Sequence, residues 1–133
     1  QEMTRHLLDE MYQPTPGGIS GNEDCGQMSA WYLLSAMGFY QVNPSWGVFA
    51  FGSPLFENVE IELPGKKNFT IETIHNSDEN IYIQSVELNG KTYSKSYIQY
   101  EDIMKGGTLR FYMGNKPNYQ FGAASQTRPF TPF

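Results

Sequence analysis

Residues 21–31 read GNEDCGQMSAW, and this stretch decides where the central helix of the chain begins. Asn22 is a residue type that favours the N-cap position, so the two acids that follow it would lie in the first turn. From there to residue 37 the sequence is apolar almost all round the helix, which is typical of a helix buried on most sides. Gly38 favours the end of such a helix. The stretch therefore predicts a buried helix over residues 23–37, with an acidic N-terminus that faces a cavity.

The two acids, Glu23 and Asp24, leave two interpretations open. In the first, they only cap the helix and complement its dipole. In the second, Asp24 is a functional carboxylate at the edge of a cavity, because a helix N-terminus stabilises the negative form of an acid. Glu23 would point about 100° away from Asp24 around the helix, which favours a structural role for Glu23.

Cys25 is the single cysteine of the chain, which excludes an internal disulfide. A cysteine at a helix start can carry a reactive thiolate, but His6 and His75 fall in other elements and offer no partner. We therefore expect a small buried thiol. Neither histidine has metal-binding spacing with other ligands, so no metal site is predicted within the chain.

Composition predicts a folded domain. Of the 133 residues, 39% are hydrophobic and 15% aromatic, which supports a core rather than disorder. The net charge is -5 and there is no cluster of Lys and Arg, which excludes nucleic acid as a partner. No apolar run reaches the length of a membrane span.

The first part of the chain has a helical pattern. Apolar residues at helical spacing predict a helix over residues 2–12, and Pro14, Pro16 and two glycines then force a loop. Two helices joined by a loop cannot cover each other's apolar faces, so Trp31 and its neighbours would be left partly exposed. Such a pair suits the end of a larger helical barrel.

After residue 43 the pattern becomes that of β-strands. Apolar and polar residues alternate, with turn signals roughly every eight to twelve residues, which predicts an antiparallel β-sandwich. Asn89-Gly90 is a strong signal for a type I′ hairpin, and residues 97–104 leave open a strand or a helical turn. The tail from Gly114 should be irregular. The expected strands lie at residues 48–51, 59–63, 69–73, 81–88, 92–93 and 108–113.

Residues 21–40, continuing to GSPLF at 52–56, closely resemble the C-terminal part of glycoside hydrolase family 92, the calcium-dependent exo-acting α-mannosidases. Further segments are similar to the same family: YIQSVELNG at 82–90, GGTL at 106–109, and the pairs MG at 113–114 and PN at 117–118. The resemblance covers essentially the whole chain, and its first motif is long and specific.

The resemblance implies a fold and a context. Residues 1–42 would be the last two helices of an (α/α)6 catalytic barrel, and residues 43–133 an antiparallel β-sandwich domain with an irregular tail. The chain would be part of a much larger enzyme, with the upstream part of the same polypeptide as its partner. That enzyme would hydrolyse terminal α-mannosides of mannose-containing glycans, in particular α-1,2-linked ones, in the periplasm or outside a bacterial cell.

The resemblance also implies roles for two residues. Hydrolysis with inversion needs one carboxylate that deprotonates water and one acid that protonates the leaving oxygen. The aspartate of the first motif has the base role in the family, which makes Asp24 the expected general base. Asn22 stands where the family often has aspartate, so it would support the water through a hydrogen bond without a charge. The general acid would lie upstream.

The metal of the family would also depend on residues outside the chain. The resemblance implies that the full-length enzyme uses calcium, and most of its ligands would lie upstream. No run here resembles a complete calcium loop. We therefore expect that this chain alone does not bind calcium tightly.

For two further side chains the sequence leaves open a binding role and a purely structural role. Gln27, one turn after Glu23, would contact substrate or metal, or would be a buried amide that bonds the backbone. Trp46, in a loop beside Pro44, would stack on a sugar or pack against the protein.

A different class of function also fits the sequence. The β-sandwich would then be a free-standing carbohydrate-binding or interaction module without catalysis. Alternating tyrosines would form its stacking surface: Tyr82, Tyr93, Tyr97, Tyr100 and Tyr112. The mass of the natural gene product separates the two classes, because a product of several hundred residues favours the enzyme.

Overall fold

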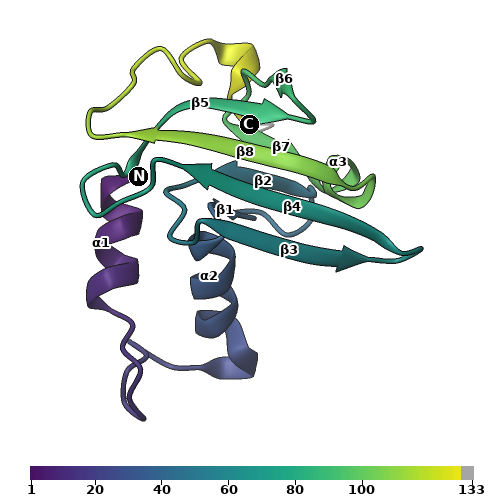
Figure 1. Cartoon of the computed structure of the whole chain (residues 1–133). Coiled ribbons are helices and arrows are strands. Elements are labelled where there is room, and N and C mark those ends of the chain that lie inside the picture. Colours follow the sequence, from purple (N-terminus) through teal and green to yellow (C-terminus); the bar gives the residue numbers. More distant parts are fainter. Residues whose placement is uncertain (130–133) are drawn as a thin grey trace.

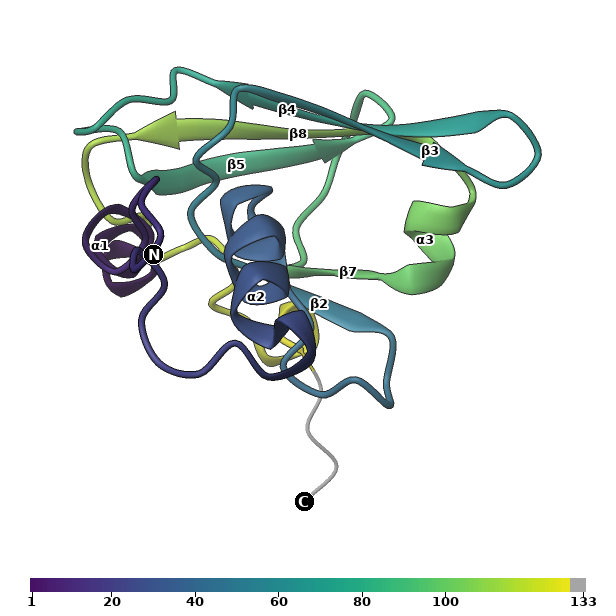
Figure 2. The same ribbon diagram turned by 90° about the horizontal axis from the view of Figure 1, so that it is seen from below.

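The computed structural model describes residues 1–129 as two projecting helices and two packed β-sheets. Helices α1 (Glu2–Glu10) and α2 (Gln27–Ala36) lie side by side and extend away from the strands (Figure 1). The shorter helical elements are η1 (Asp24–Gly26), α3 (Tyr100–Met104) and η2 (Ser125–Thr127). The two sheets face each other across the core (Figure 2).

The larger sheet has the strand order β3-β4-β8-β5-β6. Its strands are β3 (Asn58–Leu63), β4 (Lys67–Ile74), β5 (Tyr82–Leu88), β6 (Lys91–Thr92) and β8 (Gly107–Gly114). Strands β4 and β8 run parallel, with Ile71 opposite Leu109, and the other neighbours run antiparallel. The prediction of an antiparallel sandwich is therefore wrong for this pair, since an alternating pattern reports which face of a strand is buried and not the direction of its neighbour.

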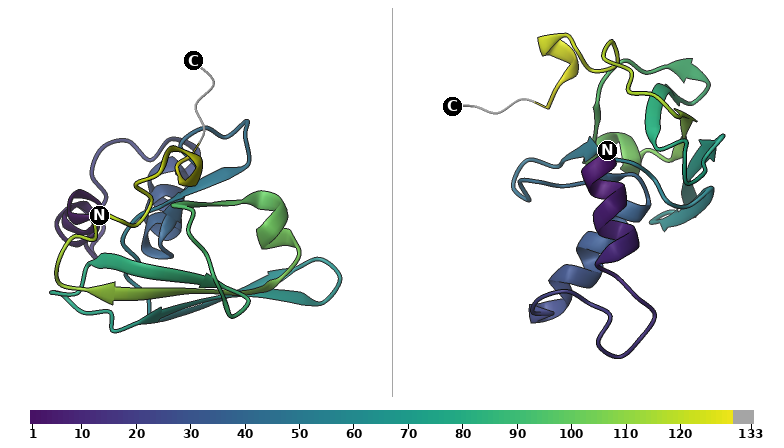
Figure 3. Two further views of the ribbon diagram at one scale, coloured as in Figure 1. Left: turned by 90° about the horizontal axis from the view of Figure 1, so that it is seen from above. Right: turned by 90° about the vertical axis from the view of Figure 1, so that its left-hand side faces the viewer.

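The smaller sheet has the strand order β1-β2-β7, and both of its pairs are antiparallel. Its strands are β1 (Phe39–Tyr40), β2 (Val48–Phe51) and β7 (Tyr97–Gln99). The chain therefore leaves the larger sheet after β6, adds β7 to the smaller sheet, and returns with β8, as the two views of Figure 3 allow the reader to follow. This crossing ties the two sheets into one unit.

The core takes apolar side chains from both sheets. Phe69 and Phe111 come from the larger sheet and Phe39 and Ile98 from the smaller one, and all four are buried. Phe111 packs edge-on against Phe51 of β2, with 5.1 Å between the ring centroids. The predicted period of two is confirmed in β4 and β8, whose alternate residues point into this core.

The turns between strands largely follow the sequence signals. Asn89 and Gly90 have φ angles of 53° and 73°, and a type I′ hairpin requires positive φ at both positions. Residues 97–104 contain both of the elements left open for them, a short strand and a helical turn. Apart from η2, the described part of the tail beyond β8 is irregular; residues 130–133 lie outside the described residues.

The predicted start of the second helix is wrong by four residues. Helix α2 begins at Gln27 rather than at residue 23, and its N-cap is Gly26 rather than Asn22. The helix cannot extend further back because Cys25 and Gly26 have φ angles of 56° and 77°, in the left-handed region. Gly38 ends the helix as predicted, with a φ angle of 103°.

Within this chain α2 is buried only near its C-terminal end. Ser35 and Ala36 are buried, whereas Trp31 is half-buried and Leu33 is 51% exposed. The prediction of a helix covered on most sides is therefore wrong for the chain by itself. The prediction that the two helices leave apolar side chains uncovered is confirmed, and Met3 of α1 is a second example.

A buried arginine attaches α1 to the strands. The Nη2 atom of Arg5 donates to the carbonyl oxygen of Pro54 and to Oδ1 of Asn76, and Nδ2 of Asn76 donates to the carbonyl oxygen of Leu55. Burial lowers the pKa of Arg5 from its ordinary value. The contact holds α1 beside the loop that precedes β3.

Tyr93 has a hydroxyl group buried without a partner. Its ring packs against the core, and no residue among 1–129 forms a hydrogen bond with the hydroxyl oxygen. Burial, with a smaller contribution from Asp102, raises the pKa of Tyr93 to about 12. Because this value lies above the ordinary value of about 10, the neutral tyrosine stabilises the folded state below pH 10, and this contribution is lost as the pH rises towards 12.

We therefore predict that Tyr93→Phe makes the stability of the chain less sensitive to alkaline pH. The free energy of unfolding, measured with urea at pH 8 and at pH 11, should fall less in the variant than in the wild type. Tyr119→Phe is the control, because Tyr119 is exposed. The stability of this variant should fall between pH 8 and pH 11 by as much as that of the wild type. Equal losses in the Tyr93 variant and the wild type would contradict the prediction.

Candidate functional site

The acidic stretch forms an exposed turn at the end of α2 that lies away from the sheets (Figure 1). Asn22, Glu23, Asp24 and Cys25 are all exposed, and Asp24 begins the 3₁₀ turn η1. The structure therefore keeps Asn22 and Asp24 together in one short segment. It places them before the helix rather than within its first turn.

Glu23 caps α2 with its side chain. Its Oε2 accepts hydrogen bonds from the backbone N–H groups of Met28 at 3.0 Å and Ser29 at 3.1 Å, and its Oε1 accepts from Ser29 at 3.2 Å. These are two of the donors that a helix N-terminus leaves unsatisfied. Capping thus falls to Glu23, and the carboxylate of Asp24 makes no hydrogen bond with any residue in 1–129. Asp24 is free to bind a ligand or a water molecule.

Gln27 lies at the edge of an aromatic pocket between α1 and α2. The pocket has a volume of about 280 Å³ and is lined mainly by Tyr12, Met28, Trp31 and Tyr40 besides Gln27. Gln27 is exposed, and its side chain makes no hydrogen bond within the described residues, so the expected buried amide is not found. The spacing of four residues between Gln27 and Trp31 puts them on one helix face.

Sequence reasoning missed Tyr12 as part of this pocket. The ring of Tyr12 stacks on Trp31 with 5.6 Å between centroids, and its hydroxyl is buried without a partner among the described residues. Burial raises the pKa of Tyr12, and the charge of Glu23 adds to the effect. The only signal in the sequence was the position of Tyr12 at the end of the helix predicted over residues 2–12; in the structure α1 ends at Glu10 and Tyr12 follows it.

Trp46 lies in a different place. It follows β1 in the loop that leads to β2, it is 36% exposed, and it does not line the pocket of Gln27. The structure of this chain therefore brings Asn22 and Asp24 together, and places Gln27 next to them along the chain, but it does not add Trp46 to the group.

Cys25 contradicts the expectation of a buried thiol. Its side chain is exposed and its backbone has φ 56° and ψ 26°, a conformation that is uncommon for a residue with a side chain. The reason is its place in the turn before the helix, where no neighbouring element covers it. Uncommon backbone angles in an exposed turn are found more often at functional sites than elsewhere.

The described residues do not assemble a metal centre. Among residues 1–129 there is no group of three or more His, Cys, Asp or Glu side chains that could hold a metal ion. Both oxygens of Glu23, the acid nearest to Asp24, already accept backbone hydrogen bonds. None of the helices in this part of the chain has the length and apolar character that a membrane span needs.

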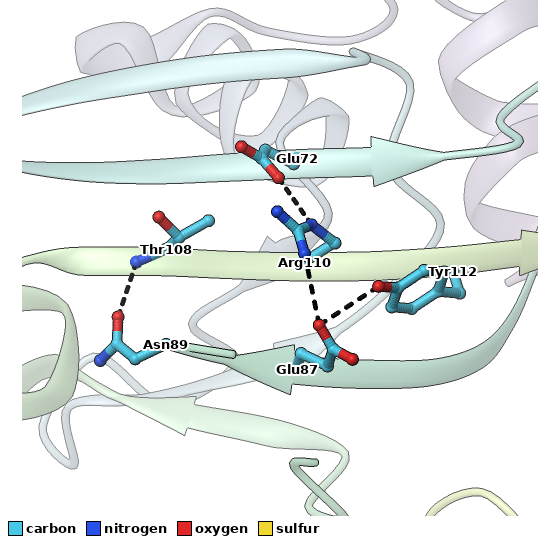
Figure 4. A network of polar contacts seen from close by, with 6 residues as sticks. All are labelled: Glu72, Glu87, Asn89, Thr108, Arg110 and Tyr112. Carbon is cyan, nitrogen blue, oxygen red and sulfur yellow. Dashed lines mark hydrogen bonds and ion pairs between the residues drawn. The ribbon is translucent and has the colours of Figure 1, made fainter. Parts of the chain in front are cut away.

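The outer face of the larger sheet carries a polar network rather than an aromatic platform (Figure 4). Nε of Arg110 on β8 donates to Glu72 on β4 at 2.6 Å, and the Tyr112 hydroxyl donates to Glu87 on β5 at 3.2 Å. The hydrogen bond with Glu72 is the main cause that raises the pKa of Arg110. The contacts link three neighbouring strands. Tyr112 lies on this face and Tyr93 in the core, so the tyrosines do not form one stacking surface.

Comparison with known proteins identifies one family. Residues 1–115 match the family described as the glycosyl hydrolase family 92 catalytic domain. A protein from Arthroderma benhamiae (strain ATCC MYA-4681 / CBS 112371), named an uncharacterized secreted glycosidase, is 34% identical over 112 residues. That match covers 82% of this chain and 14% of the relative.

Solved structures give the same result. A family GH92 α-mannosidase from Bacteroides thetaiotaomicron superimposes with a TM-score of 0.92 and 40% identity. A family GH92 inverting mannosidase from Bacteroides thetaiotaomicron VPI-5482 gives 0.90 and 38%. Each match covers 98% of this chain and 18% of the solved one, so the chain spans less than a fifth of these relatives.

The exposure of Cys25 leads to a direct prediction. In the 133-residue chain under native conditions, the thiol should react with one equivalent of a disulfide reagent such as 5,5′-dithiobis(2-nitrobenzoate) as fast as it does in the urea-unfolded chain, within a few-fold. The absorbance of the released thiolate gives the rate. A thiol that reacts only after unfolding would show that the turn is covered and would contradict the prediction.

Proposed function

We propose, because this chain belongs to glycosyl hydrolase family 92, that the full-length protein is an exo-acting enzyme that hydrolyses terminal α-mannosides with inversion. The observation that carries the proposal is the carboxylate of Asp24 in the turn before α2, which is exposed and makes no hydrogen bond with the described residues. This turn lies within residues 1–115, the part of the chain that matches the family. Solved relatives that are described as an α-mannosidase and as an inverting mannosidase support the substrate class and the stereochemistry. An α-1,2 linkage is the specific substrate proposed.

In this proposal Asp24 is the general base. One oxygen of its carboxylate takes a proton from water as the water attacks the anomeric carbon from the side opposite the leaving group. The bond to the leaving oxygen breaks, and a general acid protonates that oxygen. In an inverting enzyme the two carboxyl groups are about 6.5–9.5 Å apart. Glu23 cannot be that acid while both its oxygens accept backbone hydrogen bonds, so the acid comes from outside this chain.

The other candidate residues have supporting roles in this proposal. Asn22, two residues before Asp24, helps to hold the attacking water through its amide. Gln27 is exposed at the mouth of the aromatic pocket and contacts the substrate. Trp46 lies in the loop between β1 and β2 rather than in the turn of Asp24. It would stack on a sugar of a substrate long enough to contact both segments.

We propose that residues 1–42 complete a helical barrel and that residues 43–133 support it. The uncovered apolar side chains of α1 and α2, such as Met3 and Leu33, need a partner surface. The upstream part of the same polypeptide is that partner, since this chain spans only 14–18% of its relatives. Arg5 and the core contacts of Phe39 then fix the helix pair on the sheets.

The family implies calcium for the full-length enzyme. Calcium takes six to eight oxygen ligands, and the described residues do not offer a set of acids that could supply them. They therefore do not fit calcium by themselves, and no step of the mechanism here passes through it. We also propose that the full-length protein is secreted, a location supported by the name of the Arthroderma benhamiae relative.

The role of Asp24 is tested by Asp24→Asn in the full-length enzyme. The amide cannot take a proton from water, so kcat for an aryl α-mannoside should fall on the order of 100- to 10,000-fold while the circular dichroism spectrum stays the same. Asp9→Asn is the matched control, because Asp9 is an exposed acid on α1 outside the turn, and it should keep the wild-type rate. Near-wild-type turnover of the Asp24 variant would remove Asp24 from the mechanism.

A second prediction is that the 133-residue chain alone has no mannosidase activity. It carries the proposed base but not the acid opposite it, and the apolar faces of its helices are free to self-associate. The purified chain should show no release of the aryl group from an activated α-mannoside in the presence of calcium. Turnover by the purified wild-type chain that is lost in its Asp24→Asn variant would contradict the prediction. It would show that a whole active site lies within these residues.

A further inference from the structure

We propose that Glu23 is a positioning residue for Asp24, and that its carboxylate holds the turn that presents Asp24 by binding the first backbone N–H groups of α2. The inference rests on the proposed role of Asp24 as general base. It assigns to Glu23 a function in turnover beyond the stabilisation of a helix end. Glu23 itself does not touch the substrate in this proposal.

The hydrogen bonds of Glu23 close an unusually long loop. A typical N-cap side chain accepts from a residue two or three positions later. Glu23 instead accepts from Met28 and Ser29, five and six positions later, at 3.0 to 3.2 Å. Residues 24–27 lie between these anchor points, and Asp24 is the first of them. The carboxylate thus joins the residue before Asp24 to the body of the helix.

The turn that is closed in this way needs an external hold. Cys25 and Gly26 are consecutive residues in the left-handed region, with φ angles of 56° and 77°. This region is disfavoured for a residue with a side chain, such as Cys25. A Cβ atom on Gly26 would lie 3.9 Å from Oε1 of Glu23, so the carboxylate passes directly beside this bend.

Little else within the described residues fixes the turn. Two backbone hydrogen bonds lie inside it: the N–H of Gly26 donates to the carbonyl oxygen of Glu23 at a long 3.3 Å, and the N–H of Gln27 donates to the carbonyl oxygen of Asp24. The side chains of Asn22 and Asp24 make no hydrogen bond with residues 1–129, and residues 21–25 are all exposed. Removal of the Glu23 carboxylate should therefore let the turn relax and move Asp24. A displacement of about 1 Å at a reacting group can cost on the order of 100-fold in rate.

The test compares four variants of the full-length enzyme. Glu23→Ala removes the hold, and Glu23→Gln keeps one acceptor oxygen of the same reach. Asp24→Asn measures the proposed base, and Glu101→Ala removes an exposed acid from the first turn of another helix, α3. For each variant, kcat and KM are measured with an aryl α-mannoside, and kcat is divided by the folded fraction.

The expected result is a split between kcat and KM. Glu23→Ala should lower kcat about 10- to 100-fold per folded molecule and change KM by less than about threefold, because the base is misplaced and the sugar contacts remain. Glu23→Gln should recover most of the lost kcat, and Glu101→Ala should match the wild type. If Glu23→Ala does not fold, Glu23→Asp, whose side chain is one methylene shorter, should show the same loss of kcat.

Four results would overturn the inference. Wild-type kcat in Glu23→Ala alongside an inactive Asp24→Asn would leave the proposed function intact and show that Glu23 is dispensable. A loss explained by the folded fraction alone would make Glu23 only a helix cap. A Glu23→Gln variant as slow as Glu23→Ala would show that the charge and not the hydrogen bond matters. An active Asp24→Asn would remove the proposed function and the inference together.

Discussion

The close approach of Gly38 to Phe111 determines where α2 leaves the core. A Cβ atom on Gly38 would lie 3.0 Å from Cβ of Pro54 and 3.1 Å from Cε2 of Phe111, and its φ angle of 103° also favours glycine. Phe111 in turn packs against Phe51 of the opposite sheet. Helix α2 lies between Gly38 and the turn that contains Asp24. The packing of the two sheets therefore fixes the C-terminal end of α2, and the turn with the proposed base precedes its N-terminal end.

Elements with a local signal could be predicted from the sequence, and elements that depend on distant contacts could not. The alternation of apolar and polar residues located β3, β4, β5 and β8, because burial of one face of a strand leaves a period of two. The pair Asn89-Gly90 located a hairpin, because few residue types tolerate a positive φ angle and the hairpin needs one at both positions. The parallel pair of β4 and β8 leaves no such trace, since β5, β6 and β7 lie between them in the chain.

Prediction of the candidate site from the sequence was limited in the same way, because parts of it depend on contacts that no local pattern indicates. The N-cap was predicted at Asn22 because its residue type favours that position, whereas Gly26 is the N-cap in the structure. The actual cap reaches from Glu23 to Ser29 across two left-handed residues, and nothing in the type of Cys25 indicates such a conformation. The aromatic pocket beside Gln27 depends on the packing of α1 against α2, which the sequence of either helix does not contain.

Chemical rescue tests the central claim, that Asp24 activates the attacking water. In the full-length enzyme with Asp24→Ala, azide can enter the space of the missing carboxylate and attack without a base. With an activated aryl α-mannoside, we predict that azide restores turnover and that nuclear magnetic resonance identifies the product as β-mannosyl azide, the inverted anomer. Absence of rescue in a folded variant, or formation of the α-azide, would contradict the assignment of Asp24 as the base of an inverting reaction.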